Sequence, residues 1–219
     1  GNAAIGHLAV DLDRVVHTGL DALVAEATAL AGVGTSAQRI YREAMVITLR
    51  AVIAWAARYA EAAAAAAAQA TDPVARAAHQ RVATACRRVP ARPARDLFEG
   101  LQAIVLIHLA LHIEGHGLSV SIGLPDRVLA PFVADARDLA RTTDLLGAFL
   151  LKISANSIFG RGSKTQAITV GGMDHRGVDR CNALTLAFLE AANLVRVGDP
   201  HIFLRWHPDG DPGIKRRAL

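Results

Sequence analysis

Three histidines near the middle of the chain could do chemistry, because they recur at every fourth position. They are His108, His112 and His116, with Glu114 between the last two. Residues four apart share one face of a helix, and an HxxxH pair is a familiar arrangement of zinc ligands. We expect Gly115 to end the helix before His116, however, and no second group of ligands accompanies the pair. We therefore interpret His108 and His112 as a packed or hydrogen-bonded pair and keep a metal site as the weaker alternative.

Two further segments resemble ligand-binding loops only in part. Residues 160–165 (GRGSKT) contain the lysine of a phosphate-binding loop. Such a loop requires glycine directly before the lysine and a helix after it, but here a serine precedes the lysine and a predicted strand follows. Residues 174–179 offer too few oxygen ligands for calcium, so we predict a turn there and a helix capped by Asp179.

The chain has two cysteines, Cys86 and Cys181, which are far apart and form no CxxC pair. Both fall in predicted helices, and we expect buried structural thiols there, because nothing in their surroundings predicts a lowered pKa. Unpaired cysteines and the absence of a signal-peptide pattern indicate the reducing cytoplasm.

Composition indicates a folded, mainly helical protein. Of 219 residues, 52% are hydrophobic, 20% charged and 5% aromatic, and alanine, leucine and valine dominate. The net charge of +4 and pI of 9.6 would suit a nucleic-acid partner. The arginine runs lack interleaved aromatic residues, however, so we expect neither a nucleic-acid partner nor, from the short apolar runs, a membrane span.

The elements that position these residues are helices in the first half of the chain. Apolar spacing and breaking residues predict four of them, over 11–31, 36–70, 73–88 and 95–113. The second includes seven consecutive alanines, which we interpret as helix packed closely against a neighbour. Asp72 is the predicted cap of the third, and Pro90 and Pro93 predict an extended stretch before the fourth.

In the second half, short strands alternate with helices. We predict strands over 118–122, 166–170 and 201–206, helices over 126–138, 142–153 and 179–197, a loop over 154–164, and a turn after residue 208. Strands spaced in this way suit parallel pairing with helical crossovers. Three strands are too few for a closed barrel, which indicates that part of a larger sheet is missing. We predict one domain over 1–219, comprising a helical half (1–113) and a strand-helix half (114–219).

Several segments, in order, resemble the glycyl radical enzymes of the pyruvate formate-lyase family. They are Gly6-His7 with residues 11–19, YREAM at 41–45, WAARYA at 55–60, CRRVPARPAR at 86–95, residues 98–114, residues 166–182, and RWHP at 205–208. No single segment is specific, but the ordered set spans nearly the whole chain.

This resemblance implies a ten-stranded α/β barrel, often in a homodimer, of which this mainly helical chain would form a partial α/β barrel. It also implies a backbone glycyl radical, installed by a separate radical-SAM activating enzyme, that generates a thiyl radical on a cysteine at the barrel centre. The thiyl radical would start cleavage of a C–C, C–O or C–N bond, as in radical lyases and formate acetyltransferases. The family's cysteine loop follows the R.HP strand, whereas Cys86 and Cys181 both precede it; we therefore list no catalytic residue and no resident cofactor for this chain.

One family segment, E.NGHS.S.GR.DQ, departs from its pattern here. Ser119, Ser121 and Asp126 match it, while Leu118, Leu124 and Arg127 replace histidine, arginine and glutamine. The resemblance implies substrate-binding roles for Ser119, Ser121 and Asp126, and for Arg205 and His207 in the R.HP segment. The alternative for the two serines is simply the polar face of a strand.

Three hypotheses for the function follow. The first is a segment or truncated relative of a full-length radical lyase that is not catalytic alone, with completion by a separate chain carrying the radical loops as an alternative within it. The second is a stand-alone, inert relative that acts as a binding or scaffold protein. The third, a metal-dependent enzyme using His108 and His112, has the least support. We expect a homo-oligomer, most simply a dimer, because a partial barrel exposes apolar sheet edges.

Overall fold

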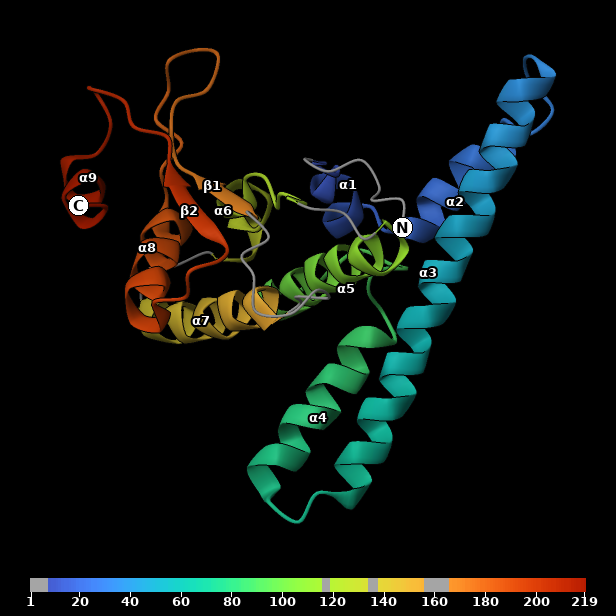
Figure 1. Ribbon diagram of the computed structural model, residues 1–219, viewed down its shortest axis with the longest axis horizontal. Coiled ribbons are helices and arrows are strands. Elements are labelled where there is room, and N and C mark those ends of the chain that lie inside the picture. The colour runs from blue at the N-terminus through green and yellow to red at the C-terminus, as the bar shows by residue number, and fades with distance from the viewer. Residues whose placement is uncertain (1–7, 116–118, 134–137, 156–165) are drawn as a thin grey trace. The chain divides into compact units, whose positions relative to one another are not determined.

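A computed structural model describes residues 8–115, 119–133, 138–155 and 166–219 of the chain (Figure 1). These residues form two compact units. One combines Gly1–Leu12 with His108–Leu219, and the other is Asp13–Ile107. The segments Gly6-His7, His116 to Leu118 and 156–165 lie outside the described residues, so the predictions made for them remain predictions.

The unit Asp13–Ile107 is helical throughout its regular structure. Its helices are α1 (Leu12–His17), α2 (Leu20–Ala29), α3 (Ser36–Gln69), α4 (Pro73–Cys86) and the first part of α5 (Leu97–Gly115) (Figure 1). Thr35 begins α3 with a capping box that includes Gln38. The side chain of Asp72 accepts hydrogen bonds from the backbone of Val74 and Ala75, which confirms the predicted cap of α4.

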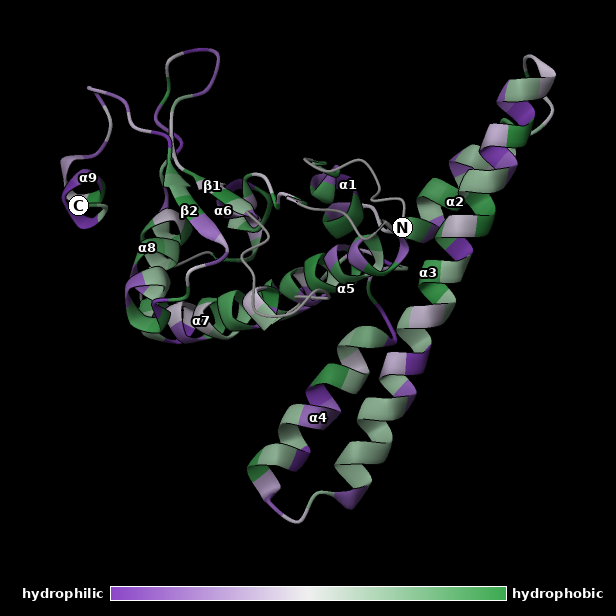
Figure 2. Ribbon diagram, in the orientation of Figure 1, coloured by the Kyte–Doolittle hydropathy of each residue, from purple (hydrophilic) through white to green (hydrophobic). Residues whose placement is uncertain are grey.

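The alanine run forms the second half of α3 and packs against α4, as predicted. Figure 2 shows this part of α3 in a nearly uniform pale green. Ala60 and Ala67 of α3 and Ala83 of α4 are buried, because such small side chains let the two helices approach closely. Nearby, Cys86 and Leu106 close a small hydrophobic core.

The prediction of one helix over 11–31 is wrong, because the chain breaks at Gly19. Gly19 has φ of +83°, and a Cβ atom there would lie 2.6 Å from the carbonyl oxygen of Ala91. The backbone N–H groups that follow, of Leu20 and Asp21, donate to the carbonyls of Pro90 and Ala91. The segment 87–92 therefore forms turns against this break, where an extended stretch was predicted.

The unit that contains residues 108–219 includes a two-stranded parallel sheet. Strand β1 (Ala167–Val170) pairs with β2 (His201–Leu204), with Ala167 opposite His201 and Val170 opposite Leu204. Helix α8 (Ala183–Val195) connects them and packs against α7 (Leu139–Ala155), where the rings of Phe149 and Phe188 meet edge to face. The predicted strands at 166–170 and 201–206, their parallel pairing and the crossover helix are confirmed.

The predicted strand over 118–122 is wrong as a continuous element. In its described part the segment makes single-residue bridges only, Ser121 with Ala9 and Gly123 with Ile168. Ser119 (φ +59°) and Gly123 (φ +76°) interrupt the extended backbone. The backbone N–H of Ile122 still donates to the carbonyl of Ala167, so the segment lies beside β1 and runs parallel to it.

Three helix predictions in this unit need correction. In the described part of the segment 126–138, where a helix was predicted, a short α6 (Pro125–Val128) is followed by a 3-10 turn, η1 (Ala130–Phe132), because Pro131 cannot donate in a continuing helix. Asn182, not Asp179, caps α8. A final helix, α9 (Pro212–Arg217), follows residue 208, where only a turn was predicted.

Helix α5 contains an 18-residue stretch, Leu97–Glu114, with a mean hydropathy of 1.4. Length and composition alone would let this stretch cross a membrane, but 56% of it is buried inside the protein. Core helices of folded domains share these properties, so this stretch is weak support for a membrane span.

Candidate functional site

A chain of four buried polar side chains joins α5 to the amino ends of both strands. Nε2 of His112 lies 3.2 Å from Nε2 of His108 and 3.2 Å from Oε1 of Gln166. The side-chain amide of Gln166 donates to Oδ2 of Asp199 at 2.5 Å, and its backbone N–H donates to Oδ1 at 2.9 Å. All four residues are buried, so these hydrogen bonds are made out of contact with bulk water.

The carboxylate of Asp199 sets the direction of this chain of hydrogen bonds. Because the NH2 group of Gln166 donates to Asp199, Oε1 of Gln166 must accept from His112. Nε2 of an uncharged His112 therefore carries a hydrogen, and Nε2 of His108 faces it as an acceptor. The two imidazoles are thus partners in a hydrogen-bond network that continues to the start of β2.

Within the described ranges, no three His, Cys, Asp or Glu side chains are arranged to hold a metal ion. The rings of His108 and His112 meet edge to face with centroids 4.4 Å apart. This geometry accords with the hydrogen-bonded pair that we preferred from the sequence.

Asp126 lies at the opposite, carboxyl end of the parallel segments. Its Oδ2 atom accepts from the backbone N–H of Gly171 and from the hydroxyl of Thr185, each at 2.7 Å. Its side chain is fully buried. Burial raises the pKa of the carboxyl, and the bonds from Thr185 and Gly171 only partly oppose that rise. This side chain ties α6, the turn after β1 and the first turn of α8 together.

Arg127, one of the residues that depart from the family pattern, holds the same turn from the other side. Its Nη2 atom donates to the carbonyl of Gly171 at 2.9 Å, with Gly172 at 3.4 Å. Both glycines have positive φ, and a Cβ atom at Gly172 would lie 2.5 Å from the side chain of Arg205. Adjacent acidic and basic side chains therefore bind the backbone N–H and the backbone carbonyl of the same residue, Gly171.

The predicted substrate-binding residues fall into two groups. Ser119 and Ser121 lie in the segment beside β1, near its amino end, and Ser119 is buried in a left-handed conformation that is rare outside glycine. Asp126, Arg205 and His207 lie at the carboxyl ends, where Arg205 is exposed and His207 is half-buried. A four-residue strand separates the two ends by about 13 Å, so the structure does not bring all five together.

Neither cysteine is in a reactive setting. Burial raises the pKa of the Cys86 thiol to about 11, within the core at the end of α4. Burial also raises the pKa of Cys181 to about 11, and the hydrogen bond to Asp179 adds to the rise. Cys181 lies in the irregular segment just before α8, not in a helix as predicted.

Sequence reasoning missed Gln166 and Asp199 as polar partners of the histidines. Gln166 begins the family-like segment 166–182, which was one available signal. Asp199 carries no comparable signal, because an Asp-Pro pair is ordinary turn chemistry.

Comparisons with known proteins define the class to which this fold belongs. A family model described as pyruvate formate lyase-like matches residues 2–219. Over 97% of the chain, the structure is similar to a glycyl radical enzyme from Archaeoglobus fulgidus, with a TM-score of 0.86 and 26% identity. Over 99% of the chain it shares the fold of the B12-independent glycerol dehydratase of Clostridium butyricum in its glycerol-bound form, with a TM-score of 0.90 and 24% identity. The fold is that of the glycyl radical enzymes.

Curated relatives agree with this class. The (2S)-3-sulfopropanediol dehydratase of Klebsiella oxytoca is 27% identical over 240 residues, an alignment that covers 99% of this chain. The isethionate sulfite-lyase of Oleidesulfovibrio alaskensis is 31% identical over 186 residues and 78% of this chain. The chain belongs to the pyruvate formate lyase-like family, and it spans 29% and 22% of the length of these two relatives.

Proposed function

We propose that these residues build one section of a radical lyase or dehydratase and do no radical chemistry alone. They would supply helices and the first parallel strands of a barrel wall. The thiyl cysteine and the glycyl residue, activated by a radical-SAM enzyme, would come from sequence outside the 219 residues. The thiols of Cys86, which is buried, and Cys181, which is half-buried, both have a raised pKa, and this supports a thiyl cysteine outside these residues.

The observation that carries the proposal is the outer edge of β2. In the part of the chain that the structure describes, β2 pairs with β1 and with no other strand. Phe203 of β2 is 54% exposed and Trp206, just beyond it, is 66% exposed, whereas Ile168 and Val170 of β1 are fully buried. An open strand edge beside large exposed apolar side chains is a surface that a further strand would cover.

The relatives suggest the class of reaction. By their names, one removes water from a sulfonated diol and the other releases sulfite from isethionate. We propose a radical elimination from a small hydroxylated substrate, with Ser119, Ser121, Arg205 and His207 as wall residues. Asp126 is better suited to holding the wall in place, because its carboxylate is fully buried against protein atoms. We also propose the cytoplasm as the compartment and a dimer as the assembly of the whole enzyme.

The size of the native polypeptide tests this proposal. Antibody raised to the chain would be used to probe an extract of the source cells, with the pure 23.1 kDa protein as a size standard. We expect a band several times larger, from a polypeptide that carries the cysteine and glycyl loops. A single band at the size of the standard, with no partner polypeptide in immunoprecipitates, would refute the proposal.

Electron paramagnetic resonance tests the absence of radical chemistry directly. The pure chain would be incubated anaerobically with a radical-SAM activating enzyme, S-adenosylmethionine and reductant. We expect no glycyl radical doublet, whereas a full-length family member should give one under the same conditions. A doublet from the chain alone would contradict the proposal.

The second candidate is a stand-alone, inert relative that acts as a binding or scaffold protein. Arg127 favours this candidate. It stands where the family pattern has glutamine, and its side chain donates to the carbonyl of Gly171, which is a structural role. Such a protein should be a monodisperse monomer that melts cooperatively. Aggregation or dimerisation through the open edge of β2 would favour the segment instead.

A further inference from the structure

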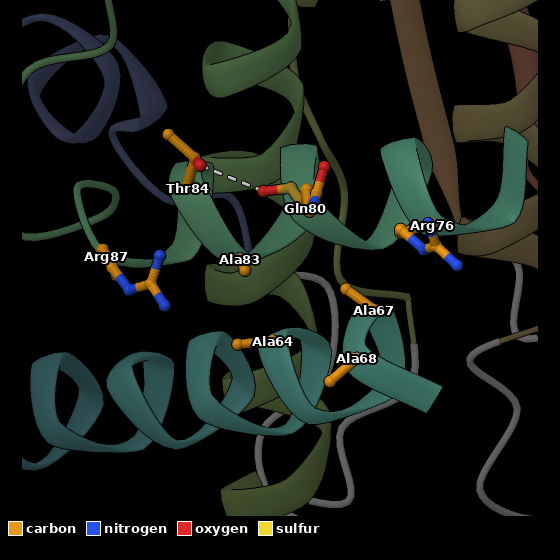
Figure 3. A pocket seen from close by; sticks show the side chains of 8 residues that line it. All are labelled: Ala64, Ala67, Ala68, Arg76, Gln80, Ala83, Thr84 and Arg87. Atoms are coloured by element: carbon orange, nitrogen blue, oxygen red, sulfur yellow. Dashed lines mark hydrogen bonds between the residues drawn. The ribbon is translucent and has the colours of Figure 1, made fainter. Parts of the chain in front are cut away.

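We draw no further inference here: the strongest candidate, the hollow between α3 and α4 with alanine side chains on its floor and Arg76 and Arg87 at its rim (Figure 3), carries none, because nothing in the part of the chain that the structure describes shows what covers it.

Discussion

The carboxylate of Asp126 lies 2.7 Å from the hydroxyl of Thr185, a residue 59 positions further along the chain. The same oxygen accepts the backbone N–H of Gly171. A single buried side chain thus sets the distance between α6, the turn after β1 and the start of α8. Any residue on the barrel wall near these elements depends on this contact for its position.

Replacing Asp126 should therefore destabilise the protein, to an extent that depends on what replaces it. Asp126→Ala leaves the N–H of Gly171 and the hydroxyl of Thr185 without an acceptor, and we expect a loss of about 2–4 kcal/mol. Asp126→Asn keeps one oxygen that can accept both bonds, so its loss should be below about 1.5 kcal/mol. Urea denaturation measures both; equal losses for the two variants would contradict this role.

The same carboxyl should contribute to the pH dependence of stability. Burial raises its pKa in the folded protein above the ordinary value of about 3.9. A raised pKa means that the folded state binds the proton more tightly than the unfolded state does. The stabilisation that Asp126 adds to the free energy of unfolding is therefore complete below pH about 3.9 and is lost as pH rises through the folded pKa. The free energy of unfolding of Asp126→Asn, measured from pH 3 to pH 8, should lack this component.

Glu99 should act in the opposite sense. Burial raises the pKa of this carboxyl, but hydrogen bonds from Arg95 and the charges of Arg95 and Arg88 outweigh burial, so the net pKa is lowered. The stabilisation that Glu99 adds to the free energy of unfolding is present above its ordinary pKa of about 4.3 and is lost as pH falls through the lowered folded pKa. Glu99→Gln should flatten the acid limb of the curve of unfolding free energy against pH, and an unchanged acid limb would contradict this role.

Gly19 should tolerate no side chain. Gly19→Ala would place a Cβ atom 2.6 Å from the carbonyl oxygen of Ala91 at a φ of +83°, and we expect a loss of at least about 2 kcal/mol. Gly32→Ala is a matched control, because no atom lies within 4 Å of a Cβ atom there. Thermal melting of both variants provides the comparison, and similar melting temperatures would show that the break between α1 and α2 is not required.

The Gln166–Asp199 contact should be sensitive to the loss of one oxygen. Asp199→Asn turns an NH2 group toward either the backbone N–H or the side-chain amide of Gln166, so two donors face each other. We expect a cost of about 1–3 kcal/mol and altered imidazole NMR signals from His112. Asp209→Asn, whose side chain is 82% exposed, should leave both unchanged.

Much of the fold could be predicted from local sequence. The bounds of α3 and the cap of α4 agree with prediction because capping side chains and alanine propensity act within a few residues. The parallel pairing of β1 and β2 could be inferred from the helix between them. The interruption of the strand predicted over 118–122 could not be inferred, because an alternating pattern does not reveal that Ser119 is held at positive φ.

By itself, the sequence determined the helical half, the strand-helix order and membership of a family, since ordered motifs and periodic patterns are properties of the chain alone. Only the tertiary structure decided which polar groups meet. Asp126 pairs with Thr185, and His112 reaches Asp199 through Gln166, because folding brings residues more than fifty positions apart within hydrogen-bonding distance. A buried donor or acceptor must find such a partner or pay the cost of lost hydration, and no local pattern specifies which partner that will be.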